Sequence, residues 1–151
     1  MGFTILEILV VIGLLSVISS FALIVGMDSY RSYSFRADRD TLVSLLQRAR
    51  SQSVNNLCIG SGSCTGGRPH GLAIFPDSYV LFQGSSYALR DTAADERIPA
   101  STAILRTGLS EVVFAQLSGS AAPSGDITLK GGNGQISTTT ISSVGQIVWT
   151  N

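Results

Sequence analysis

Charged side chains are scarce in this chain, and their signs cancel. They make up 13% of the 151 residues, and ten basic residues stand against ten acidic ones. Arginine supplies all of the basic residues except Lys130. A balanced charge exerts no general attraction on nucleic acid or on acidic lipid. The composition therefore argues against a protein whose main partner is nucleic acid.

Side chains that bind metals or catalyse reactions are also few. His70 is the only histidine, and no nucleophile or carboxylate stands beside it, so we expect a surface or turn histidine. Asp91, Asp95 and Glu96 cluster, but they lack the alternating ligands and the glycine of an EF-hand, so we expect a solvated loop. We predict no metal site, no cofactor and no enzymatic activity.

Cysteine occurs only twice, at Cys58 and Cys64, within a glycine- and serine-rich stretch that we expect to form a loop over residues 57–69. In an oxidising compartment a disulfide across so short a loop would contribute roughly 2 kcal/mol by the chain-entropy estimate. A metal pair is the weaker alternative, because the zinc pattern of four ligands is absent. We favour a disulfide between the two cysteines.

A long apolar run dominates the N-terminus. Residues 8–26 contain no charge and no proline, and a helix of that length, at about 1.5 Å per residue, spans a hydrocarbon core of roughly 30 Å. No basic segment precedes the run, no Ala-x-Ala-like site follows it, and it is longer than the apolar core of a typical signal peptide. We therefore predict a retained transmembrane helix over residues 3–27.

Glu7 is the single acid at the start of this run. A carboxylate that enters an apolar phase is costly and usually marks a function or a specific partner. If the chain were cut between Gly2 and Phe3, the new α-amino group would lie at the depth of a neighbouring copy's Glu7, and pairing would remove two desolvation costs together. Alternatively, Glu7 belongs to the first helical turn, where the macrodipole favours an acid. Residue chemistry alone leaves both interpretations open.

The sequence Gly2-Phe3-Thr4-x-x-Glu7, followed by the apolar run, resembles the processing site and N-terminal helix of type IV pilins and type II secretion pseudopilins. In that family a prepilin peptidase cuts after the glycine and N-methylates the new first residue, and an acid stands at the fifth mature position. The resemblance implies that Gly2 is the cleavage glycine, Phe3 the methylated residue and Glu7 the assembly glutamate. The family leader is normally longer and basic, so we expect residues 1–2 to be a residual leader.

Helical periodicity continues beyond the apolar run. The predicted inner stripe comprises Tyr30, Tyr33, Ala37, Thr41, Leu42, Leu45, Leu46 and Ala49, and the predicted outer face comprises Arg36, Arg39, Asp40, Gln47, Arg48 and Arg50. We predict one helix of about 50 residues that ends near Val54 or Asn56, with a transmembrane half over residues 3–27 and an amphipathic half over residues 28–56. Because Asp28, Asp38 and Asp40 alternate with its arginines, the outer face favours solvent or a neighbouring subunit over a basic binding edge.

The chain over residues 70–151 is rich in β-formers and in turn residues. We predict a hairpin of residues 71–75 and 79–83, strands within 111–117, 126–129, 135–142 and 146–149, and a short strand within 98–106. No strand alternates with a helix, which indicates an antiparallel meander or sandwich. The predicted fold is α+β and pilin-like, with the long N-terminal helix packed on an antiparallel head over residues 28–151. The order of elements and the closing Gly145-Gln146-Ile147-Val148 strand resemble the GspH/FimT-like minor pilins.

The resemblance implies a structural subunit: a minor pilin or pseudopilin that initiates or caps a type IV pilus or a type II secretion pseudopilus. It implies a single-pass precursor in the bacterial inner membrane with the head on the periplasmic or extracytoplasmic side. The implied partners are other pilin or pseudopilin subunits, prepilin peptidase and the inner-membrane assembly platform. One alternative is a DNA-binding minor pilin for DNA uptake, although Lys130 is the only lysine and residues 147–151 carry no cation. Another is an anchored single-span protein that never polymerises.

Overall fold

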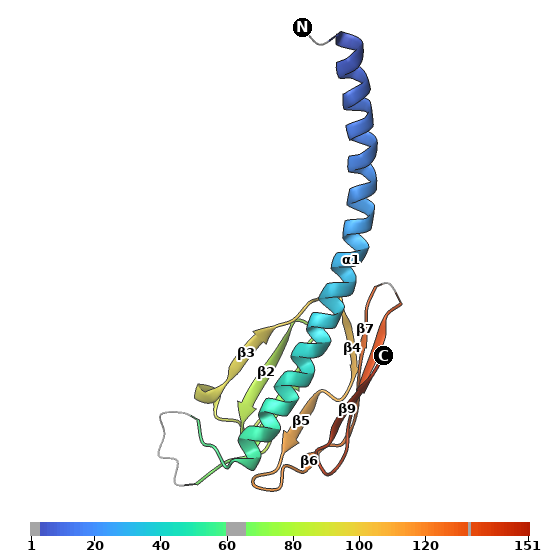
Figure 1. Cartoon of the computed structure of the whole chain (residues 1–151). Coiled ribbons are helices and arrows are strands. Elements are labelled where there is room, and N and C mark those ends of the chain that lie inside the picture. The colour runs from blue at the N-terminus through green and yellow to red at the C-terminus, as the bar shows by residue number, and fades with distance from the viewer. Residues whose placement is uncertain (1–3, 60–65, 133) are drawn as a thin grey trace. The chain divides into compact units, whose positions relative to one another are not determined.

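The structure, a computed structural model, describes residues 4–59, 66–132 and 134–151, with the side chains of residues 21–26 and 28 outside the description. The fold is α+β, as predicted: a long helix α1 (Ile5–Val54), a short 3-10 helix η1 (Thr92–Ala94) and antiparallel sheets (Figure 1). The chain forms two compact units, Met1–Ser34 and Phe35–Asn151. The division between residues 27 and 28 in the sequence analysis marks where we expect the helix to leave the membrane, not a division between compact units. It stays a prediction.

Helix α1 ends in a Schellman-type cap. Asn56 has a positive φ of 55°, a conformation that asparagine adopts more readily than most side chains. The Leu57 N–H donates to the Gln52 carbonyl at 3.0 Å and the Asn56 N–H donates to the Ser53 carbonyl at 3.1 Å, which are the two bonds of the motif. The predicted end of the helix near Val54 is confirmed.

The described part of the second unit contains two antiparallel sheets. The larger sheet has the strand order β3-β2-β1-β5-β6, formed by Glu96–Pro99, Ser78–Gln83, His70–Ile74, Glu111–Phe114 and Ala121–Ala122. The smaller sheet has the order β4-β7-β8-β9, formed by Leu105–Gly108, Gly125–Lys130, Ile136–Ile141 and Ile147–Thr150. Within the second unit, Figure 1 shows β3 and β9 on opposite sides of helix α1.

Most predicted strands are confirmed, with ends that differ by one or two residues. The predicted hairpin is formed by β1 and β2, in which Leu72 pairs with Leu81. The run 111–117 is shorter than predicted, because Leu117 has a positive φ of 64° and the chain turns after β5. The stretch 98–106 does not hold a strand of its own. It contains the end of β3 and the start of β4, which belong to different sheets.

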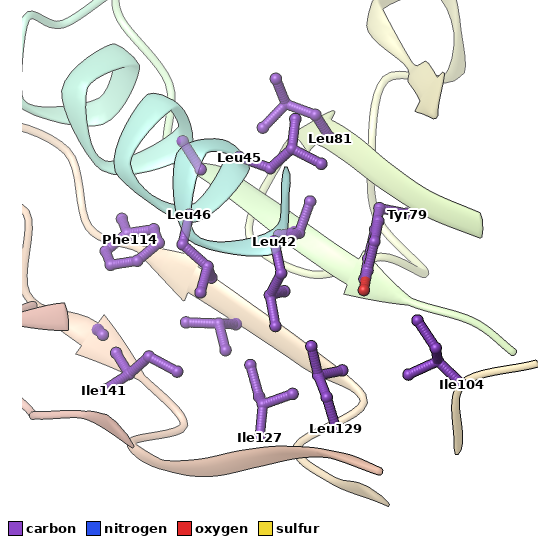
Figure 2. Close-up of a cluster of buried hydrophobic side chains, with 14 of the residues drawn as sticks. Leu42, Leu45, Leu46, Tyr79, Leu81, Ile104, Phe114, Ile127, Leu129 and Ile141 are labelled. Carbon is purple, nitrogen blue, oxygen red and sulfur yellow. The ribbon is translucent and has the colours of Figure 1, made fainter. Parts of the chain in front are cut away.

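One hydrophobic core joins the helix to both sheets. Leu42, Leu45, Leu46 and Ala49 of α1 are buried with residues of the larger sheet and of the smaller sheet in a single cluster. Figure 2 shows the helix leucines among Tyr79, Leu81, Phe114, Ile127, Leu129 and Ile141. Burial of each large apolar side chain contributes on the order of 1.5–3 kcal/mol. The cluster therefore fixes this part of α1 on the sheets.

The predicted inner stripe is wrong at its N-terminal end. Tyr30 and Tyr33 are 71% and 73% exposed and belong to the first unit, and Ala37 is also exposed. The buried face begins instead at Phe35 and includes Arg39, for which the outer-face prediction is therefore wrong. The Arg39 guanidinium lies 4.1 Å from the centre of the Trp149 ring, so the C-terminal strand covers it.

Candidate functional site

The N-terminal segment of helix α1 exposes large apolar side chains. Between residues 5 and 18, eleven such side chains are 49% to 81% exposed: Ile5, Leu6, Ile8, Leu9, Val10, Val11, Ile12, Leu14, Leu15, Val17 and Ile18. Successive helical residues point about 100° apart, so these side chains surround the helix. A helix that is apolar on all sides is normally enclosed by other helices or by lipid. The segment is therefore the candidate functional site.

Three serines lie within or directly after this apolar segment, and each has a partner for its hydroxyl donor. The hydroxyls of Ser16, Ser19 and Ser20 each donate at 2.8 Å to a backbone carbonyl three or four residues earlier in the helix. Such bonds to the preceding turn satisfy the hydroxyl within its own helix. These serines can therefore enter an apolar environment without a partner from another chain.

Glu7 lies in the first turn of α1, directly after a capped start. The Glu7 N–H donates to the Thr4 hydroxyl at 3.3 Å and to the Thr4 carbonyl at 3.1 Å, so Thr4 is the N-cap residue and Glu7 the third helical residue. The pattern Thr-x-x-Glu is that of a capping box. The structure thus places Glu7 as the first-turn interpretation expects, and its side chain is exposed. Its assembly role stays a prediction.

The remaining predicted site residues fall partly outside the description. Gly2, Phe3 and Cys64 are not among the described residues, whereas Cys58 is described and is disulfide-bonded.

A membrane span needs a helix of sufficient length and apolarity, and none is found over the described residues. The same residues hold no group of three or more histidine, cysteine, aspartate or glutamate side chains placed to bind a metal ion.

The prediction of a surface or turn position for His70 is wrong. His70 is the first residue of β1, which is paired with β2 on one side and β5 on the other, and it is 1% exposed. Its N–H donates to the Ser53 hydroxyl at 2.9 Å, but neither ring nitrogen has a hydrogen-bond partner. Burial lowers the pKa of His70. The Arg68 backbone and the Gln83 side chain oppose this shift without forming a well-aligned bond to the ring.

A buried ion pair joins α1 to both sheets. One Arg106 nitrogen lies 2.7 Å from a carboxylate oxygen of Asp38, and the two side chains are 3% and 6% exposed. The Tyr79 hydroxyl donates to the same Asp38 oxygen at 3.0 Å and accepts from Arg106 Nε at 2.9 Å. Burial raises the pKa of Tyr79 far above its usual range. The prediction that Asp38 belongs to the charges of the outer face is therefore wrong.

The remaining hydrogen-bonding capacity of Arg106 is used by the backbone. Its second terminal nitrogen donates to the carbonyls of Pro76, Ser101 and Ile104 at 2.8 to 3.0 Å. An ion pair whose donors are occupied in this way is characteristic of a structural connection, because a catalytic acid or base needs a path to a substrate proton. We assign this network to the architecture of the head.

The acidic cluster at residues 91–96 is not a plain solvated loop. Asp91 caps η1 by accepting the Ala93 N–H at 3.1 Å. Asp95 pairs with Arg90 at 2.8 Å, and Glu96 begins β3 and pairs with Arg48 at 2.6 Å. The three carboxylates therefore have separate structural contacts.

The fold defines an α+β protein with a long N-terminal helix and a head of two antiparallel sheets. Comparison of the chain with protein-family models, with curated proteins and with solved structures finds no match. The resemblance to pilins thus rests on the residues of the chain, above all on the motif at residues 2–7 and on the apolar segment that follows it.

Proposed function

We propose that the chain is a minor pilin or pseudopilin, a structural subunit that initiates or caps a type IV pilus or a type II secretion pseudopilus. It enters the bacterial inner membrane as a single-span precursor, with its head on the periplasmic or extracytoplasmic side. Prepilin peptidase cuts it before Phe3 and methylates the new N-terminus. The assembly platform then transfers it from the membrane into the filament.

The observation that supports this proposal most strongly is the exposed apolar segment of residues 5–18. At about 25 cal/mol for each Å² of apolar surface, leaving such a segment in water is very unfavourable. Lipid covers it before assembly, and the helices of neighbouring subunits cover it afterwards. The serine hydroxyls are compatible with both environments, because they are hydrogen-bonded within their own helix.

In the filament, Glu7 pairs with the positive N-terminus of a neighbouring subunit. Its carboxylate is the only formal charge of the described chain between residues 4 and 20, and the chain offers it no ion-pair partner there. An opposite charge from the neighbour offsets the cost of burying the carboxylate. The same pairing sets the axial position of one subunit against the next.

Two substitutions of Glu7 separate its charge from its role in the capping box. Glu7→Ala removes both, whereas Glu7→Gln keeps a side chain that serves at this capping position and removes only the charge. We expect both full-length variants to insert into the membrane as the wild type does, and both to be lost from sheared filaments. The measurement is the amount of protein in the membrane and filament fractions.

Ser16→Ala is the matched control, because it changes a polar side chain of the same segment without altering charge, and it should enter filaments normally. Mass spectrometry of the wild-type chain should find N-methylated Phe3 at the N-terminus. Normal incorporation of Glu7→Gln would refute the electrostatic pairing. A mature chain that retains Met1 would favour the non-polymerising anchored protein.

A further inference from the structure

A groove of about 470 Å³ lies between the last turns of α1 and the turn that leads into β9. Gln47, Arg50, Ser51, Val54 and Asn55 line it from the helix, and Val144, Gln146 and Ile147 line it from the other side. All of these residues belong to the second unit. The lining combines one cation, Arg50, with four uncharged polar and three aliphatic side chains.

Arg50 is held in this groove by two glycine turns. A Cβ atom added to Gly145 would lie 3.0 Å from Arg50 Nε, and one added to Gly119 would lie 3.4 Å from the same atom. Both glycines have positive φ values, 77° and 64°, so their turns approach the arginine closely. Both turns therefore pack against the Arg50 side chain at its Nε atom.

Arg50 has no counter-ion in the described chain. Arg39, Arg48, Arg90, Arg97 and Arg106 each form an ion pair, whereas Arg50 forms neither an ion pair nor a side-chain hydrogen bond with a described residue. Its Nε atom is covered by the protein and has no partner. The unpaired arginines Arg36 and Arg68 differ from it, because their side chains are exposed to water.

A partly buried guanidinium without an anion is unfavourable, and a carboxylate that reaches its two terminal nitrogens offsets part of that cost with two parallel hydrogen bonds. Val144 and Val54 beside it are 67% and 40% exposed, so an occupant that also covers them gains apolar contact. The chemistry of the groove thus selects a carboxylate with an aliphatic side chain next to it. Arginine is also one of the residue types that most often dominate an interface energetically.

We propose that the Arg50 groove is a docking site for an acidic segment of the adjacent subunit's head in the same filament. A carboxylate of that segment binds Arg50, and an aliphatic neighbour packs on Val144 and Val54. The inference rests on the proposed function, because assembly is what brings a second head against this one. It adds a contact between heads to the contact between helices.

The first test is charge reversal in the full-length chain. Arg50→Glu should leave the amount of protein in the membrane unchanged and reduce the amount in sheared filaments by more than about tenfold. Arg68→Glu is the matched control, because it reverses an exposed arginine of the same head that lacks an ion pair, and it should assemble like the wild type. Equal incorporation of the two variants would overturn the proposal.

The second test keeps Arg50 and therefore does not depend on how well its variant folds. A photocross-linking amino acid in place of Val144 should capture, in filaments, a peptide of another subunit with an aspartate or glutamate within about two residues of the link. Changing that acid to arginine should restore the incorporation of Arg50→Glu. A captured peptide without an acid, or a failed restoration, would argue against the docking site.

The two tests also distinguish this inference from the proposed function. If Glu7→Gln blocks assembly while Arg50→Glu assembles normally, the proposed function as a filament subunit is supported and only the docking site is refuted. If the wild-type chain never enters a filament, the proposed function itself fails, and the docking site fails with it.

Discussion

At Asp38 the chain places a charge inside the core of its head. Bringing a carboxylate and a guanidinium out of water costs several kcal/mol for each ion, and the attraction between them offsets this only when the remaining donors and acceptors are also satisfied. That condition is met here, because Tyr79 and three backbone carbonyls complete the contacts of Asp38 and Arg106. The geometry is specific, so we assign to the pair the alignment of α1 with β2 and β4.

His70 makes the stability of the head depend on pH. Burial lowers its pKa in the folded chain, whereas an exposed histidine in the unfolded chain takes up a proton near pH 6.5. Below about pH 6.5 the unfolded chain therefore binds more protons, and the free energy of unfolding falls with pH until the folded histidine is protonated as well. The loss is on the order of 1.4 kcal/mol for each unit of difference between the two pKa values.

Urea unfolding of the full-length chain in mild detergent at pH 7.5, 6.0 and 5.0 measures this dependence. His70→Gln keeps a polar side chain of similar size that does not titrate, so it should remove most of the loss between pH 6.5 and 5. Because His70 is the only histidine, the wild type carries no other histidine that contributes in this interval. The same pH dependence in both proteins would show that another group is responsible.

The turn between β8 and β9 depends on glycine at position 145. Gly145 has a φ of 77°, and an added Cβ would lie 1.9 Å from the Gly119 carbonyl oxygen. Gly145→Ala should therefore lower the free energy of unfolding by about 1–2 kcal/mol for the left-handed backbone and by about 1–3 kcal/mol more for the clash. Urea unfolding of the variant and of the wild type measures the sum of the two losses in the free energy of unfolding.

Gly134→Ala separates the two contributions. Gly134 has a similar φ of 74°, but nothing lies within 4 Å of the position that an added Cβ would take, so only the backbone cost of about 1–2 kcal/mol applies. We expect Gly145→Ala to be clearly less stable than Gly134→Ala. Equal losses would mean that the two turns at Gly119 and Gly145 can move apart at little cost.

The elements that the sequence predicts well are those with local patterns. The hairpin of β1 and β2 has a run of β-formers on each side of the turn at Pro76, and the end of α1 has a cap residue at Asn56. Strand β6 has only two residues and no periodicity, and it forms because β5 lies beside it. The burial of Arg39 depends on Trp149 and Asn151, more than a hundred residues away, so no local pattern could have predicted it.

The two candidate sites, Glu7 and the Arg50 groove, also differ in whether a local sequence pattern predicts them. The placement of Glu7 follows from four consecutive residues that begin at Thr4, so the sequence could predict it. The Arg50 groove combines residues 47–55 with residues 144–147, and the contact of the two glycine turns with Arg50 exists only after folding. Helical periodicity alone assigns Arg50 merely to the outer face of the helix.

The core of the head is complete without the first unit. Every buried residue of the main cluster lies between Phe35 and Ile141, and the large apolar side chains of residues 5–18 are exposed. A fragment of residues 34–151, which keeps Ser34 as the N-cap residue of the shortened helix, should therefore be soluble without detergent and unfold cooperatively. Its melting temperature should agree within a few degrees with that of the head in the full-length chain in detergent.

Circular dichroism during heating, together with sedimentation to show a monomer, tests this expectation. The matched control is a fragment of residues 50–151, which loses Phe35, Leu42, Leu45, Leu46 and Ala49 from the core. Each lost leucine alone removes about 2–5 kcal/mol, so this shorter fragment should not fold. Aggregation of the longer fragment would mean that the head needs the first unit for its stability, and that the exposed apolar segment serves folding as well as assembly.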